Sequence, residues 1–358
     1  MAIVPIVTIV NYQVYQRKKI MTRKMKIVTS IVVVALLGGG YGWKLYKDNK
    51  AASAIADDND TIAVAPLGPQ FNADSAYAFT AAQCDFGPRT MNSTAHDKCG
   101  EWIVKKFKSY GLDVKTQKAD LKGFDGTILH STNIIASYNP KAATRILVCA
   151  HWDSRPWADN DPDESKHKEP VMAANDGASG VAVMLELARD IATDKKLNKD
   201  YGVDFVCFDA EDWGQDSVED SWALGAQHFA NNQPEGMSWT YGILLDMVGG
   251  EGAQFYQEQM SQHYAPDIVT KVWNAAAAAG FSAYFPTTSG GAVTDDHLPL
   301  NKAGIPTVDI IPFYRDLPDN SFGPTWHTTH DTMEHIDKRT LKAVGQTVIQ
   351  VLYSEGNQ

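Results

Sequence analysis

The sequence predicts an α/β fold: a single globular domain in which a central, mostly parallel, twisted sheet is covered by helices on both faces. Four short runs rich in β-branched and aromatic residues each end at polar residues, as buried strands do. Amphipathic stretches lie between them, and this alternation is typical of parallel sheets. The four expected strands are Arg145–Cys149, Asp204–Phe208, Ile243–Leu245 and Thr307–Ile311.

The expected helices alternate with these strands along the chain. A helix over His96–Tyr110 precedes the first strand. Apolar residues recur at helical spacing from Val181 to Ala188, and again within Asp267–Ala279. A last helix, Leu341–Tyr353, closes the chain. We therefore expect one folded domain over residues 70–358.

The charge of the chain is unevenly distributed. The 358 residues include 32 basic and 43 acidic side chains, which give a formal net charge of −11. Nine of the basic residues but only one acidic residue fall within residues 1–50, so the rest of the chain has a net charge of −19. The acidic body argues against nucleic-acid binding. Four cysteines in so long a chain exclude a disulfide scaffold.

The basic N-terminal end is typical of a membrane-targeting segment. Residues 27–43 have no charge and follow a basic segment, residues 1–26, which is expected to be cytoplasmic. We expect residues 27–43 to be an uncleaved anchor, with a linker at residues 44–69 and a translocated body. A cleaved secretory signal is the main alternative, since Ala54-Ile55-Ala56 has the A-x-A pattern. A buried core helix fits the basic flanks less well.

Acidic and histidine side chains follow the predicted strands or lie in the loops near them: His151, Asp176, Glu211, Asp212, Asp246, Asp295 and His327. Ligands bind outside the carboxyl ends of strands in such sheets, so we expect these side chains to meet at one edge. Each has an ordinary explanation by itself, such as a helix N-cap for Asp176 or a surface position for His327. Together, so many carboxylates repel one another unless a cation compensates them, which predicts a metal site. Carboxylate and imidazole ligands without thiolate suit zinc.

The four cysteines are expected to lie apart from this site. Cys149 and Cys207 fall inside predicted strands, where they would be buried as small apolar residues. Cys84 and Cys99 lie 15 residues apart and could form a disulfide if the body is translocated.

The order of the motifs resembles that of the zinc aminopeptidase and glutaminyl cyclase superfamily. The motifs are H-x-D at His151, N-D-G-x-S-G at Asn175, D-x-E-D at Asp209, L-L-D at Leu244, D-D-H-x-P at Asp295 and W-H-T at Trp326. The likeness runs from about Tyr77 to the C-terminus. The segments HWDSRPWAD, DDHLP and WHT look like those of glutaminyl cyclases, particularly of bacterial forms. The resemblance implies a zinc aminopeptidase-like fold for a catalytic domain of residues 70–358.

The resemblance also implies the metal ligands. Asp176, Asp212 and His327 match the three ligands of one Zn²⁺ ion. Two positions depart from the pattern of the relatives. Asp212 stands where relatives often have glutamate, so the backbone must come closer to the metal, and Asp309 stands where animal cyclases often have histidine.

Further roles follow from the same likeness. Glu211 matches the general acid/base, and Asp246 and Asp295 match carboxylates hydrogen-bonded near it. Trp326 matches an aromatic wall of the substrate pocket, although nine tryptophans in the chain leave a core position open as the alternative. His151 and Asp246 match a second-metal position that aminopeptidases fill and cyclases do not.

The activity implied is that of a glutaminyl-peptide cyclotransferase. Such an acyltransferase converts the N-terminal glutamine of peptides or proteins to pyroglutamate and releases ammonia. Two alternatives stay open: a two-zinc aminopeptidase on the same fold, and an inactive receptor or adhesion ectodomain, which would be expected to lose ligands. The likeness to bacterial forms places the translocated body in the periplasm, held at the inner membrane by residues 27–43.

Overall fold

The computed structural model describes residues 66–317 and 322–356. The expected basic segment, the expected anchor and most of the expected linker lie in residues 1–65, outside the described residues. Within the described part, no helix is long and apolar enough to cross a membrane.

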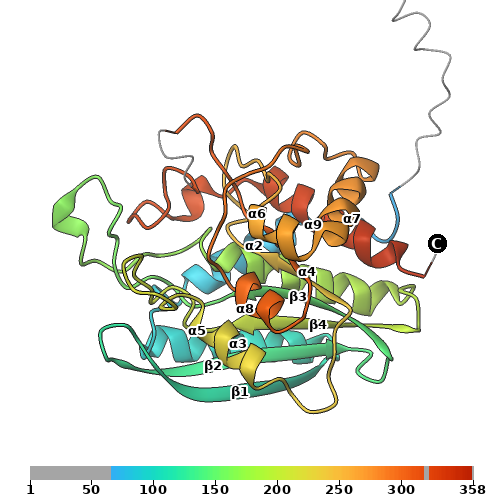
Figure 1. Ribbon diagram of the computed structural model, residues 1–358, viewed down its shortest axis with the longest axis horizontal. Helices are drawn as coiled ribbons and strands as arrows, with labels where there is room; N and C mark the ends of the chain where they lie inside the picture. The colour runs from blue at the N-terminus through green and yellow to red at the C-terminus, as the bar shows by residue number, and fades with distance from the viewer. Residues whose placement is uncertain (1–65, 318–321, 357–358) are drawn as a thin grey trace, which may run out of the picture. The chain divides into compact units, whose positions relative to one another are not determined.

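A six-stranded sheet lies at the centre of the described domain (Figure 1). Its strands are β1 (Asp113–Lys122), β2 (Ile128–Tyr138), β3 (Thr144–His151), β4 (Tyr201–Phe208), β5 (Tyr241–Leu245) and β6 (Thr307–Ile310). They are ordered β1-β2-β4-β3-β5-β6 across the sheet. The strands β3 to β6 are mutually parallel, and each coincides with one of the four predicted strands. The predicted α/β fold is therefore confirmed.

The two strands that the sequence pattern did not predict form the antiparallel edge of the sheet. β1 pairs with β2, and β2 pairs with β4, both antiparallel. No side chain of β1 is buried, so its polar sequence lacks the apolar run that marks an internal strand. In β2, polar residues precede the buried stretch Ile134–Ala136 and obscure the strand pattern.

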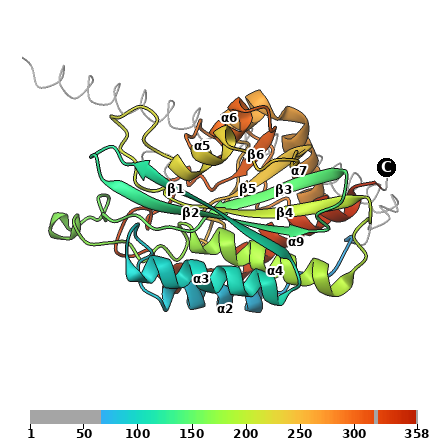
Figure 2. The ribbon, with the colours of Figure 1, turned by 90° about the horizontal axis from the view of Figure 1, so that it is seen from below.

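Helices cover both faces of the sheet (Figure 2). They are α2 (Ala73–Cys84), α3 (Thr94–Ser109), α4 (Ala178–Asp194), α5 (Leu224–Asn231), α6 (Gln259–Tyr264), α7 (Pro266–Ala278), α8 (His297–Lys302) and α9 (Lys338–Ser354). Alternate residues of the parallel strands face the two layers. In β3, for example, Ile146 and Val148 pack in the larger core with α2, α3, α4, α7 and α9. Leu147 and Cys149 pack in a smaller core with α5 and α8.

The start of α4 approaches the end of β5 closely, and only glycine permits this approach. A Cβ atom on Gly180 would lie 2.2 Å from the carbonyl oxygen of Leu245 and 2.8 Å from the Cβ atom of Ala150. This contact brings Asp176, two residues before α4, next to the carboxyl ends of β3 and β5.

We expect the substitution Gly180→Ala to lower the free energy of unfolding by about 2 kcal/mol, because the added methyl group overpacks backbone atoms. The higher helix propensity of alanine offsets only about 1 kcal/mol of the clash. Urea unfolding of the purified variant tests this. A midpoint equal to that of the wild type would show that α4 is free to move away from β5.

All four cysteines are free thiols. Cys149 and Cys207 are fully buried within strands, as predicted. The disulfide suggested between Cys84 and Cys99 is not formed, and that suggestion was wrong. Cys99 is buried in the core on α3, whereas Cys84 lies at the end of α2 and packs only partly against this core.

Candidate active site

Three predicted residues bring ligand atoms together at the carboxyl ends of the parallel strands. One atom each of Asp176, Asp212 and His327 lie within 4.8 Å of one another, and all three side chains are buried. The Nε2 of His327 is 3.2 Å from Oδ1 of Asp212 and 3.6 Å from Oδ2 of Asp176. Among the described residues, the buried Oδ2 of Asp212 has no hydrogen-bond partner. An unpartnered carboxylate oxygen in such a set of oxygen and nitrogen donors fits a zinc ion.

Strained backbone conformations accompany these side chains. Positive φ angles, which are uncommon outside glycine, occur at Ala210 (55°), Met247 (52°) and His327 (55°). Ala210 directly precedes Glu211, and Met247 directly follows Asp246. Such conformations cost about 1–3 kcal/mol each and cluster at functional sites, where the fold holds them in place.

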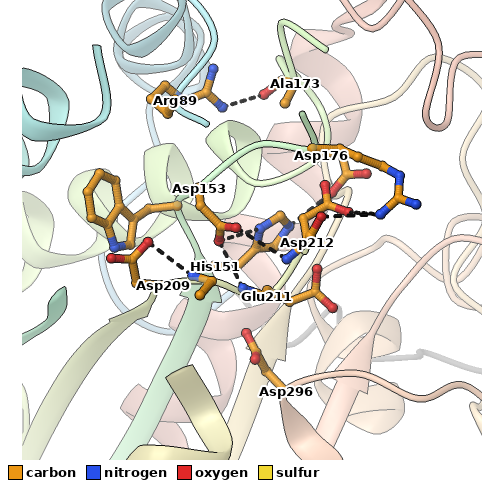
Figure 3. Close-up of polar contacts among 12 residues, drawn as sticks. Arg89, His151, Asp153, Ala173, Asp176, Asp209, Glu211, Asp212 and Asp296 are labelled. Carbon is orange, nitrogen blue, oxygen red and sulfur yellow. Dashed lines mark hydrogen bonds and ion pairs between the residues drawn. The ribbon is translucent and has the colours of Figure 1, made fainter. Parts of the chain in front are cut away.

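Two buried aspartates hold the backbone of the segments that present the ligands. The carboxylate of Asp153 accepts hydrogen bonds from the backbone N–H groups of Glu211 (3.1 Å) and Asp212 (3.2 Å) (Figure 3). The carboxylate of Asp331 accepts from the N–H groups of Asn175 (2.8 Å) and Asp176 (3.0 Å). Burial, with the charge of Asp176 next in effect, raises the pKa of Asp331 to about 7. Asp153 ends the H-x-D motif and Asp331 lies three residues after the W-H-T motif, but sequence reasoning gave neither a role.

A buried arginine steadies the loop that leads to Asp176. Arg89 donates a hydrogen bond of 2.7 Å to the carbonyl oxygen of Ala173 and another to that of Met172 (Figure 3). Ala173 has a positive φ of 57°, so these bonds hold a strained turn three residues before the ligand.

A second buried arginine connects two of the candidate ligands. Arg155 forms a bidentate ion pair with Asp159 at 2.7 and 2.6 Å, and its Nη1 is 3.3 Å from Oδ1 of Asp212. Asp159 in turn lies 3.7 Å from Nδ1 of His327. The guanidinium also lies 4.9 Å from the ring centroid of Trp222. Although burial opposes ionisation, His327 and Arg155 hold the pKa of Asp212 below its usual value.

We expect the substitution Arg155→Lys to weaken zinc binding about tenfold, because lysine cannot bond Asp159 and Asp212 at once, and residues that orient ligands affect affinity by this amount. Competition with a chelating dye measures the change. Arg339→Lys is the control, since Arg339 forms a similar pair with Asp337 on the exposed surface of α9. Equal zinc affinity in Arg155→Lys and the wild type would contradict the role of Arg155.

Glu211 faces a cavity of about 470 Å³ that Asp176, Asp246, Asp295 and His327 also line. Burial raises the pKa of Glu211 well above its usual range, and the nearby carboxylates of Asp212 and Asp295 raise it further. A carboxyl group with a raised pKa is suited to exchange protons near neutral pH.

Asp246 and Asp295, the carboxylates expected near Glu211, line the same cavity as Glu211. Asp246 lies 3.3 Å from Nε2 of His151. Asp295 contacts Asp309, and burial, with the charge of Asp246 next in effect, raises the pKa of Asp295 to about 7. Of these two carboxylates, Asp295 raises the pKa of Glu211 through its charge.

Aromatic side chains form the wall of the cavity. Trp326 lines it as predicted, with its ring centroid 4.1 Å from that of His327 and 4.9 Å from that of Phe322. Trp222 also lines the cavity, and its ring stacks over His327 at 6.0 Å. Sequence reasoning did not single out Trp222.

His151 lies beside the first ligand set. Its Nε2 is 2.9 Å from Oδ1 of Asp176, and atoms of His151, Asp176 and Asp246 lie within 4.8 Å of one another. The two clusters share Asp176, so the positions of these side chains alone accommodate either one or two metal ions.

A mostly parallel sheet with buried carboxylate and histidine ligands beyond its carboxyl ends defines a metalloenzyme of the zinc aminopeptidase-like fold. The chain belongs to peptidase family M28, whose profile matches residues 133–352.

Three relatives illustrate the similarity. The structure of Bacteroides thetaiotaomicron glutaminyl cyclase bound to N-acetylhistamine is 48% identical, with a TM-score of 0.78, covering 81% of this chain and all of that chain. A Zn-dependent exopeptidase from Parabacteroides distasonis is 46% identical, with a TM-score of 0.77 and the same coverage. Aminopeptidase YwaD of Bacillus subtilis is 30% identical over 278 residues, 74% of this chain. The family and the exopeptidase both support zinc as the metal.

The curated relatives are longer than the matched region. The chain spans 54% of the length of the B. subtilis aminopeptidase and 65% of that of a glutaminyl-peptide cyclotransferase from Gloydius blomhoffii, to which it is 27% identical. Aminopeptidase and cyclotransferase activities therefore both occur among these relatives, and this chain matches only part of each relative.

Proposed function

We propose that the protein is a zinc-dependent glutaminyl-peptide cyclotransferase, an acyltransferase that acts on peptides or proteins with an N-terminal glutamine. The main support is the 48% identity to a bacterial glutaminyl cyclase over all of that chain. The buried Glu211 beside the ligand set, in a cavity with aromatic walls, supplies the groups that the reaction needs.

The substrate contains both reacting groups. The α-amine nitrogen of the glutamine attacks the carbonyl carbon of its own side-chain amide. The new C–N bond closes the pyroglutamate ring, and the bond to the amide nitrogen breaks, which releases ammonia. The pocket must therefore fold the glutamine so that amine and amide meet, and holding two groups in this way supplies much of the rate.

Each side chain has a defined task in this scheme. Zinc held by Asp176, Asp212 and His327 would polarise the amide carbonyl and stabilise negative charge on its oxygen. Glu211 accepts the proton that the α-amine loses and delivers a proton to the departing nitrogen. Trp326 and Trp222 line the cavity around the folded glutamine and reduce the access of water, which would otherwise compete as nucleophile.

The second candidate is a two-zinc aminopeptidase, which the cluster of His151, Asp176 and Asp246 favours. We nevertheless propose one bound ion, because the DDHLP and WHT segments at Asp295 and Trp326 resemble those of cyclases. The inactive-ectodomain alternative is disfavoured, since no expected ligand is replaced by a residue unable to bind metal.

A substrate comparison tests this proposal. The zinc-loaded protein is incubated with a Gln-initiated peptide and with a Leu-initiated peptide of otherwise identical sequence. We expect ammonia from the first and no free amino acid from either. Release of leucine with no ammonia from the Gln peptide would establish the aminopeptidase instead.

We further propose that the enzyme is periplasmic and anchored to the inner membrane by residues 27–43. Support comes from the uncharged run and its basic N-terminal flank. After cell fractionation, the intact chain is expected in the membrane fraction, and a chain starting at residue 44 fused to a cleavable signal is expected in the soluble periplasm. A soluble wild-type protein cut near Ala56 would indicate a cleaved signal instead.

A further inference from the structure

The loop between β4 and α5 places three acidic side chains over the mouth of the catalytic cavity. Asp216, Glu219 and Asp220 are exposed, and all three line this cavity. The base of the loop is fixed by Ser221, whose buried Oγ accepts from the N–H of Gln215 (2.9 Å) and donates to a carbonyl of the same loop. The acidic tip is therefore held at the entrance.

These three carboxylates have no cationic partner within the described residues. None of them takes part in an ion pair, whereas the exposed acids Glu101 and Asp74 pair with Lys105 and Lys338. Lys302 is the one lysine or arginine among the described residues that line the cavity. The three carboxylates of this loop therefore make the entrance negatively charged, and they are free to interact with a bound ligand.

A second cavity of about 250 Å³ adjoins the main cavity beside the loop. The two cavities share Asp220, Trp222 and Asp295 as lining residues. Asp295 is only 4% exposed, and its carboxyl group contacts that of Asp309. The two spaces therefore meet beside Asp220 of the acidic tip.

We propose that the acidic tip selects substrates with a basic residue directly after the N-terminal glutamine. This inference rests on the proposed function, which places the glutamine beside Glu211 and leaves the next residue near the mouth. Unpaired carboxylates at a cavity mouth attract cations and repel anions. A lysine or arginine side chain in the second position gains contacts with Asp216, Glu219 or Asp220, and a glutamate there is repelled.

The test compares amidated peptides Gln-Lys-Ala and Gln-Glu-Ala with the full zinc-loaded chain. We expect kcat/KM to be about threefold to tenfold higher for the lysine peptide, mostly through KM, as for partly screened exposed charges. Because salt screens such charges, the ratio should fall towards one in 0.5 M NaCl. The triple variant Asp216→Asn, Glu219→Gln, Asp220→Asn should lose the preference even at low salt.

A second triple variant controls for net charge. Asp113→Asn, Asp200→Asn and Glu235→Gln remove three exposed acids that line neither cavity. This variant should keep the wild-type ratio of kcat/KM between the lysine and the glutamate peptide. Loss of the preference in both triple variants would overturn the proposal. A ratio of one for the wild type at low salt would overturn it as well.

Binding is measured separately, by calorimetry with the zinc-loaded Glu211→Gln variant and the same two peptides. Tighter binding of the lysine peptide supports selection by the acidic tip, whether or not the wild-type chain forms pyroglutamate. Failure of the wild-type chain to form pyroglutamate would count only against the cyclase proposal. Equal affinity of the two peptides overturns the selection itself.

Discussion

Replacing Glu211 with glutamine is expected to lower kcat for a Gln-initiated peptide by about 10²–10⁴-fold while zinc stays bound. Glutamine has nearly the same shape as glutamate, but it cannot accept the proton that the α-amine loses. Because Glu211 lies beside the ligands and is not one of them, metal content should not change. Turnover is measured by ammonia release, and bound zinc by metal analysis of the same sample.

Glu235→Gln is the matched control for this prediction. It makes the same chemical change at an exposed position outside the cavity, so activity and zinc content should equal those of the wild type. A Glu211→Gln variant that retains zinc and wild-type turnover would remove Glu211 from the mechanism. A variant that loses zinc would instead assign Glu211 to the metal.

The second large effect is expected from His327→Ala, which removes the imidazole ligand. The three-residue site would keep only two carboxylates, so zinc affinity should fall at least 100-fold and activity should fall to background. Stability reports the same loss without any assay of turnover. Zinc at 1,000 times its dissociation constant stabilises a folded protein by about 4 kcal/mol, and the variant should lose this increment.

His330→Ala tests whether the effect belongs to the ligand or to the loop. His330 is exposed in the same loop, three residues after His327, and its side chain has no hydrogen-bond partner among the residues that the structure describes. Its variant should unfold at the wild-type temperature and respond normally to zinc. If His327→Ala still showed full zinc-dependent stabilisation, the metal would have to bind elsewhere.

The parallel half of the fold was predictable because its strands are buried on both faces. β3 to β6 therefore appear as short apolar runs bounded by polar residues. β1 was not predictable in this way, because it forms the sheet edge and buries no side chain. It pairs with β2 as a hairpin across the short turn at residues 123–127, and the Asp125-Gly126 pair in this turn is the local signal that could have indicated it.

The candidate ligands were predictable because each lies beyond a strand or within a recognisable motif. The residues that position them were not, since their partners are distant in sequence. Asp331 bonds backbone groups at positions 175 and 176, and Arg155 reaches a residue 57 positions away. The suggested disulfide was wrong for a similar reason: sequence spacing places Cys84 and Cys99 near each other along the chain but does not show how each one packs.

The central claim is that the glutamine amine, and not water, attacks at this site. The most direct measurement is mass spectrometry of a Gln-initiated peptide incubated with the zinc-loaded protein. We predict a single product about 17 Da lighter than the substrate, through loss of ammonia, with release of one ammonia per peptide. A peptide shortened by one residue, together with free glutamine, would contradict the account and identify an aminopeptidase.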